Sequence, residues 1–165
     1  MLYLSPDLQM AQWWLADVYM QRGEWHQAKE YFYKTIRSRS SDWEAYVNLG
    51  VIENQLGNKE GAMAHFKKAF QINPRAAVAY SNVGAMYKQE GKEDRARRFF
   101  KKAIQLDVYA LGARKNLAAI YMKQCRIEEA QRLLEEVLRI APKDIYAMEK
   151  IRMLRLGGDP YIKCP

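Results

Sequence analysis

The chain repeats itself with a period of 34 residues. When the sequence is shifted by this period, residues 45–50 (AYVNLG) fall on residues 79–84 (AYSNVG). Residues 62–69 (AMAHFKKA) fall on residues 96–103 (ARRFFKKA), and no gap is needed. A fixed period of this length is the signature of an array of small, equivalent structural units that bury their apolar faces against one another.

The same period divides the chain into four repeats, at residues 9–42, 43–76, 77–110 and 111–144. Within each repeat, apolar residues recur three and four positions apart, which predicts amphipathic helices. Gly23, Gly57 and Gly91 occupy equivalent positions and predict a turn between two helices, because glycine readily takes the left-handed conformation that ends a helix. Repeat 4 has Cys125 there instead, and that conformation would cost it about 1 kcal/mol.

Six positions recur in all or most of the repeats. They are a Leu-type position (Leu15, Leu49, Val83, Leu117), a small residue (Ala16, Gly50, Gly84, Ala118), an aromatic position (Tyr19, Glu53, Tyr87, Tyr121), a second-helix alanine (Ala28, Ala62, Ala96, Ala130), a large apolar residue (Phe32, Phe66, Phe100, Leu134) and a closing position (Ser40, Pro74, Val108, Pro142). With these positions the chain resembles the tetratricopeptide-repeat family over nearly its whole length. The resemblance implies an all-α fold, a right-handed α-solenoid of four helix-turn-helix repeats.

The two ends of the array differ from its middle. Residues 145–156 resemble a fifth first helix with no second helix after it, so we expect a C-terminal capping helix followed by a tail at 157–165. Residues 1–8 align with the end of a repeat's second helix. They are either the remnant of a preceding repeat or a short lead-in, and the sequence leaves both interpretations open.

A column of asparagines is the most specific functional signal. Asn48, Asn82 and Asn116 occupy the same place in three consecutive repeats, and Trp14 breaks the column in repeat 1. The family resemblance implies that first helices line a concave groove. An amide side chain offers both a donor and an acceptor, so the column predicts contacts to the backbone of an extended peptide. It resembles the asparagine ladder of O-linked N-acetylglucosamine transferase. The alternative is that these asparagines brace neighbouring helices.

Other first-helix positions are expected to give the groove its chemical character. The predicted peptide-contacting residues, besides the asparagines above, are Trp13, Asp17, Val47, Val51, Asn54, Ser81, Lys88, Lys115, Met122 and Lys123. Repeat 1 is then the aromatic end and repeat 4 the basic end, which suits a peptide with acidic residues. An alternative interpretation of Trp13 and Trp14 is burial beneath a missing upstream repeat.

The second helices carry a stripe of basic residues. The predicted convex patch consists of Lys68, Arg95, Arg98, Lys101 and Lys102. Such a stripe attracts nucleic acid or an acidic protein, but a solvated helix face is the more ordinary interpretation. We therefore do not expect nucleic acid to be the main partner. Binding of nucleic acid or an acidic partner to this basic face stays as an alternative.

Composition narrows the remaining classes. The formal charge of +8 makes an acidic protein or peptide partner plausible. No nucleophile elbow, phosphate loop or metal-ligand spacing occurs, so we expect no enzyme activity, no cofactor and no metal site. No signal peptide or membrane-spanning run is visible, which favours a cytoplasmic location. We predict a non-catalytic scaffold that binds a protein or peptide in its groove. The main alternative is self-assembly into a homo-oligomer through exposed surface of the first repeat.

Overall fold

The computed structural model describes residues 6–156 of the chain, and within that range it contains nine α-helices and no strand. In chain order the helices are α1 (Pro6–Gln21), α2 (Trp25–Ser38), α3 (Trp43–Gln55), α4 (Lys59–Ile72), α5 (Ala77–Gln89), α6 (Glu93–Leu106), α7 (Leu111–Lys123), α8 (Ile127–Ile140) and α9 (Ile145–Arg155). The predicted all-α class is confirmed. Residues 6–8, assigned from sequence to the lead-in, belong to α1. The rest of the lead-in and the tail at 157–165 lie outside the described residues.

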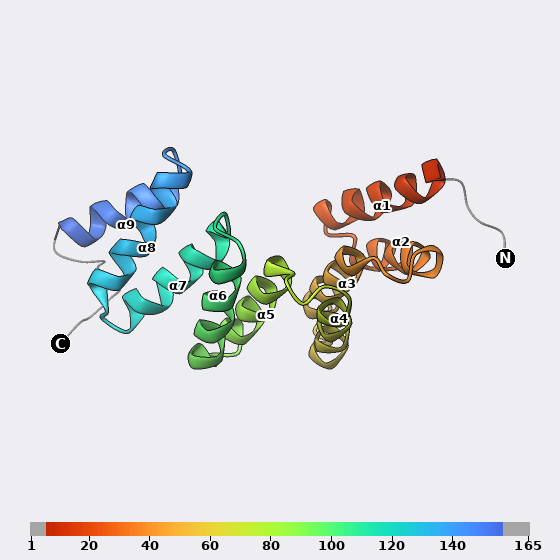
Figure 1. Ribbon diagram of the computed structural model, residues 1–165, viewed down its shortest axis with the longest axis horizontal. Coiled ribbons are helices and arrows are strands. Elements are labelled where there is room, and N and C mark those ends of the chain that lie inside the picture. The colour runs from red at the N-terminus through yellow and green to blue at the C-terminus, as the bar shows by residue number, and fades with distance from the viewer. Residues whose placement is uncertain (1–5, 157–165) are drawn as a thin grey trace. The chain divides into compact units, whose positions relative to one another are not determined.

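Consecutive helices form hairpins that stack on one another inside two compact units (Figure 1). Unit 1 ends at Ala79 and unit 2 begins at Tyr80, so the division falls inside α5. In unit 1, α2 contacts both α1 and α3, and α3 also contacts α4. In unit 2, α7 contacts α6 and α8, and α8 contacts α9. A second helix therefore packs against its own first helix and against the first helix of the next repeat, as the stacking of repeats requires.

The turn inside each hairpin has the predicted left-handed residue. Gly23, Gly57 and Gly91 have φ angles of 72°, 82° and 73°, and Cys125 has a φ of 57°. Because a side chain in this region crowds the following carbonyl, Cys125 carries a cost of about 1 kcal/mol that the three glycines avoid. Repeat 4 therefore keeps the family's turn geometry in spite of its departure in sequence.

Each hairpin is centred on a large apolar side chain from its second helix. Phe32, Phe66, Phe100 and Leu134 are all buried. A Cβ added to Gly50 would lie 2.8 Å from the ring of Phe66. In repeat 2 the two helices therefore approach so closely that Gly50 has no room for a Cβ. Repeat 3 has the same arrangement at Gly84 and Phe100, whereas repeats 1 and 4 have alanine at this position.

Repeat 2 has polar residues at two positions where repeats 1 and 3 have an aromatic pair. In repeat 3, Tyr87 lies 5.4 Å from Phe99 between ring centroids. The equivalent residues of repeat 2 are Glu53 and His65. Glu53 is only 4% exposed, and its carboxylate accepts hydrogen bonds from Lys29 Nζ at 2.8 Å and from Asn58 Nδ2 at 2.9 Å. Burial opposes ionisation of Glu53, but these hydrogen bonds outweigh it and lower its pKa.

His65 is half-buried at the second of these positions. Its Nε2 lies 3.3 Å from the Tyr33 hydroxyl, and burial lowers its pKa below the ordinary 6.5, against the opposing charge of Glu53. Once the pH falls below about 6.5, His65 is therefore protonated more readily in the unfolded chain than in the folded chain, and this difference favours unfolding. It follows that the contribution of His65 to stability is present at neutral pH and is lost as the pH falls.

We predict that His65→Phe, which introduces the residue found at this position in repeat 3, reduces the loss of stability in mild acid. Urea unfolding of the wild type and the variant at pH 7 and pH 5 measures this, because Phe cannot be protonated. The variant should lose less free energy of unfolding between the two pH values than the wild type. An equal loss in both proteins would show that His65 does not carry the effect.

Candidate functional site

In unit 2 the two predicted asparagines lie on successive first helices, Asn82 on α5 and Asn116 on α7, and both are half-buried. Asn116 is engaged inside the chain: its Oδ1 accepts from Lys88 Nζ at 2.8 Å and its Nδ2 donates to the carbonyl of Gly112 at 3.0 Å. The side chain of Asn82 makes no hydrogen bond to any part of the chain that the structure describes. The amide of Asn82 is therefore free to pair with a ligand, whereas Asn116 has only its remaining donor and acceptor capacity.

Lys88 connects α5 to α7 through its hydrogen bond to Asn116, and its charge is partly desolvated. Burial lowers the pKa of Lys88, and the nearby Glu93 carboxylate opposes that shift. Within residues 6–156, Lys88 forms no ion pair with a carboxylate. It is thus a partly desolvated ammonium group with a neutral partner, an arrangement that an incoming anionic group would stabilise.

The other two lysines of the predicted basic end are already paired. Lys115 contacts Asp144 at 2.8 Å, and this hydrogen bond lowers the pKa of Asp144. Lys123 contacts Glu93 at 2.5 Å. Their charges are therefore largely compensated, whereas Lys88 is the predicted groove lysine that forms no ion pair within the described residues.

Unit 1 presents an aromatic hollow instead. Trp13 is half-buried and lies edge-on to Phe32 with ring centroids 6.2 Å apart, while Trp14 is 59% exposed. Trp13 therefore packs within its own hairpin. A pocket of about 460 Å³ opens beside both rings, and its wall includes Met10, Thr35 and Glu44. Trp14, which breaks the asparagine column, is the ring with more surface available for a ligand.

Most of the other predicted groove residues are half-buried, and they differ in their hydrogen bonds. Asn48 is half-buried and, within the described range, forms no side-chain hydrogen bond. Asp17 accepts a hydrogen bond from Gln21 at 2.6 Å. Val51 and Asn54 are half-buried, as is Ser81 in unit 2.

Two predicted contact residues are core residues instead. Val47 and Met122 are each only 3% exposed, and Met122 belongs to the apolar cluster of unit 2. The prediction that they contact a ligand is therefore corrected for both. The spacing rule placed them on the right helices but could not show that neighbouring helices cover them.

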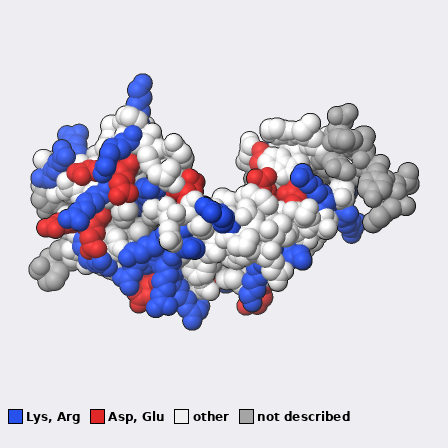
Figure 2. All heavy atoms as spheres, in the orientation of Figure 1, with Lys and Arg blue, Asp and Glu red and all other residues white. Residues whose placement is uncertain are grey.

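The predicted basic patch is concentrated on α6. Arg95, Arg98, Lys101 and Lys102 are all exposed there, and Figure 2 shows lysine and arginine gathered over the region that α6 occupies in Figure 1. Arg95 lies over the ring of Tyr87 at 5.6 Å, and Lys102 donates to Gln105 at 3.3 Å. Lys68 is exposed on α4, in unit 1.

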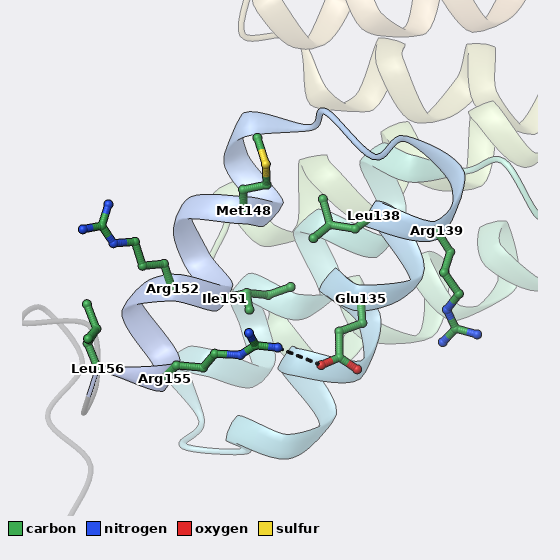
Figure 3. A pocket seen from close by; sticks show the side chains of 8 residues that line it. All are labelled: Glu135, Leu138, Arg139, Met148, Ile151, Arg152, Arg155 and Leu156. Carbon is green, nitrogen blue, oxygen red and sulfur yellow. Dashed lines mark ion pairs between the residues drawn. The ribbon is translucent and has the colours of Figure 1, made fainter.

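A groove that the sequence did not predict lies between α8 and α9, with a volume of about 690 Å³ (Figure 3). Leu138, Met148 and Ile151 form its apolar floor, and Arg139, Arg152, Arg155 and Glu135 stand around it. The sequence predicted a capping helix at residues 145–156, but it did not show that side chains of α8 and α9 surround one hollow.

Among the described residues, no group of three or more His, Cys, Asp or Glu side chains is placed to hold a metal ion. None of the helices α1–α9 combines the length and apolar character required to cross a membrane.

Comparison with known proteins identifies the class of protein that this helical-hairpin fold defines. A tetratricopeptide-repeat family model matches residues 14–77, and a second model of the same description matches residues 87–150. The chain belongs to the tetratricopeptide-repeat family. Members of this family are generally non-catalytic scaffolds for protein interactions, and that general role is supported for this chain. No curated protein matches the sequence.

Solved structures show the same fold. TTC0263, a thermophilic tetratricopeptide-repeat protein of Thermus thermophilus, is 25% identical with a TM-score of 0.77, over 92% of this chain and 84% of that one. PilF of Pseudomonas aeruginosa is 21% identical with a TM-score of 0.80, over 91% and 68%. YrrB, described as a tetratricopeptide-repeat protein with an unusual peptide-binding site, is 22% identical with a TM-score of 0.63, over 86% and 73%.

Proposed function

We propose that this chain is a non-catalytic adaptor that binds an extended peptide segment of a partner protein along its first helices. In unit 2 the peptide backbone pairs with Asn82 and with the free capacity of Asn116, and an acidic group of the peptide lies against Lys88. Asn48 holds the equivalent place in repeat 2. Soluble partners inside the cytoplasm fit this role.

The observation that carries the proposal is the hydrogen-bonding state of this face. Asn82 is a half-buried amide whose donors and acceptor have no partner among the described residues. Lys88 is partly desolvated and is bonded to an amide rather than to a carboxylate. A half-buried amide without a partner in the described chain and an ammonium group without an ion pair are both available to pair with a ligand. YrrB, which has the same fold, is described as having a peptide-binding site of its own.

The test uses a displayed library of 16-residue peptides selected on the full chain. Peptides bound at this face should lose about tenfold or more in affinity for Asn82→Ala/Asn116→Ala, since each lost hydrogen bond is worth about 1 kcal/mol. The matched control is Gln71→Ala/Gln105→Ala, which removes two exposed amides from second helices and should change affinity less than about twofold. Equal binding by the wild type and the Asn82/Asn116 variant would instead assign the asparagines a bracing role.

Lys88→Met separates binding from folding in the same assay. Replacing a partly desolvated ammonium group by an apolar side chain of similar length should leave the free energy of unfolding unchanged or raise it by about 1 kcal/mol. The variant should nevertheless weaken acidic peptides. A loss of stability together with unchanged affinity would place Lys88 among the structural residues.

A second candidate function, self-association, is favoured by one feature of unit 1. Leu15 and Val18 on α1 are 42% and 41% exposed, whereas the equivalent Leu49 and Ile52 on α3 are fully buried. On α3 this face packs against α2, the second helix of the preceding repeat. On α1 no helix within residues 6–156 covers it. Light scattering at increasing concentration measures this: the apparent mass should rise for the wild type and stay monomeric for Leu15→Glu. A monomer at all concentrations would exclude this candidate.

A further inference from the structure

The groove between α8 and α9 joins an apolar floor to an excess of positive charge. Figure 3 shows Leu138 and Ile151 facing each other across it, with Arg155 and Glu135 meeting at one end. The only ion pair among its lining residues is Arg155–Glu135, at 4.0 Å. Arg139 and Arg152 are exposed, and neither has an ion-pair partner in the part of the chain that the structure describes. Three guanidinium groups therefore stand beside one carboxylate.

Equivalent surfaces elsewhere in the chain receive a helix. In unit 1, α3 packs against α2 and is then covered by α4. In unit 2, α9 packs against α8 in the same way, but no further helix follows within the described residues. The shape of this hollow is therefore that of a helix-binding surface, with Met148 and Ile151 one turn apart on α9.

A second helix of the ordinary repeat type does not fit this surface. Adding the period to Ala118 and Tyr121 gives Arg152 and Arg155. In repeat 3 the same small position is Gly84, where an added Cβ would lie 2.8 Å from the ring of Phe100. An arginine at that position prevents a phenylalanine-bearing second helix from approaching as it does inside the array. The occupant must instead tolerate arginine at the point of contact.

We propose that this groove is a docking site for an acidic amphipathic helix of a partner protein. The apolar face of that helix lies on Leu138, Met148 and Ile151, and its carboxylates pair with Arg139 and Arg152 on either side. Guanidinium groups favour carboxylates because of their planar array of donors. From Met148 to Arg155 the α9 surface extends about 10 Å, at about 1.5 Å per residue, which suits about two turns of a bound helix. This site is distinct from the asparagine face of α5 and α7.

The experiment selects peptides from the displayed 16-residue library on the full chain and sorts them by the variant that abolishes binding. Arg139→Glu/Arg152→Glu removes the two arginines that have no ion pair and leaves Arg155–Glu135 in place. Peptides of this site should bind that variant at least tenfold more weakly and Met148→Ser several-fold more weakly. They should carry Asp or Glu beside Leu or Ile at helical spacing, and circular dichroism should show a gain of helix on binding.

The matched control is Arg98→Glu/Lys102→Glu on α6, which changes the net charge by the same amount on another surface of unit 2. It should change affinity less than twofold, and so should Asn82→Ala/Asn116→Ala, so failure here is distinguishable from failure of the proposed peptide face. Thermal unfolding of every variant confirms folding.

Five outcomes overturn the proposal. Selected peptides that lack acidic residues, or that bind Arg139→Glu/Arg152→Glu as tightly as the wild type, contradict the assigned chemistry. Equal weakening by the α6 control assigns the effect to net charge. Binding only by a chain truncated after Leu156 assigns the groove to the protein's own last residues. A wild-type dimer in light scattering that Arg139→Glu/Arg152→Glu dissociates assigns it to a second copy.

Discussion

The structure depends on the contact between a large apolar side chain of each second helix and a small residue of the first helix. At Gly50 and Gly84 the ring of the facing phenylalanine comes so close that an added Cβ would meet it at 2.8 Å. This close approach fixes how far apart the two helices of a hairpin lie, because apolar interiors are packed at high density and do not accommodate even a methyl group without a shift. The separation in turn determines which side chains remain on the outer faces.

The functional surfaces follow from positions that this contact leaves uncovered. On α5 and α7 it leaves half-buried amides and a partly desolvated lysine at the surface. On α9 the small residue is replaced by Arg152, and the aromatic residue by Arg155, so the hairpin pattern stops and a charged groove takes its place. Repeat 2 shows a milder substitution, since Glu53 and His65 stand where repeat 3 has an aromatic pair, and burial lowers the pKa of His65. Departures from the repeat are therefore where this chain acquires properties of its own.

Much of the fold could be predicted from the sequence because the period carries physical information at several levels. The small residue, the buried phenylalanine and the turn glycine each recur 34 residues apart, and each has one structural explanation. Even the left-handed Cys125 followed from its place in the column. The site was less predictable. Spacing could not show that Val47 and Met122 are covered, that Asn116 is bonded to Lys88, or that Lys115 and Lys123 have carboxylate partners, because these facts depend on side chains brought together from different helices.

A double-mutant cycle on Gly84 and Phe100 tests the central contact most directly. Chemical denaturation would be measured for Gly84→Ala, Phe100→Leu and both together, since repeat 4 already combines Ala118 with Leu134. The account predicts that Gly84→Ala destabilises the wild-type chain but is neutral or stabilising beside Phe100→Leu, with a coupling energy of about 1 kcal/mol or more. Additive effects, with no coupling between the two positions, would contradict the claim that the ring sets the separation of the helices.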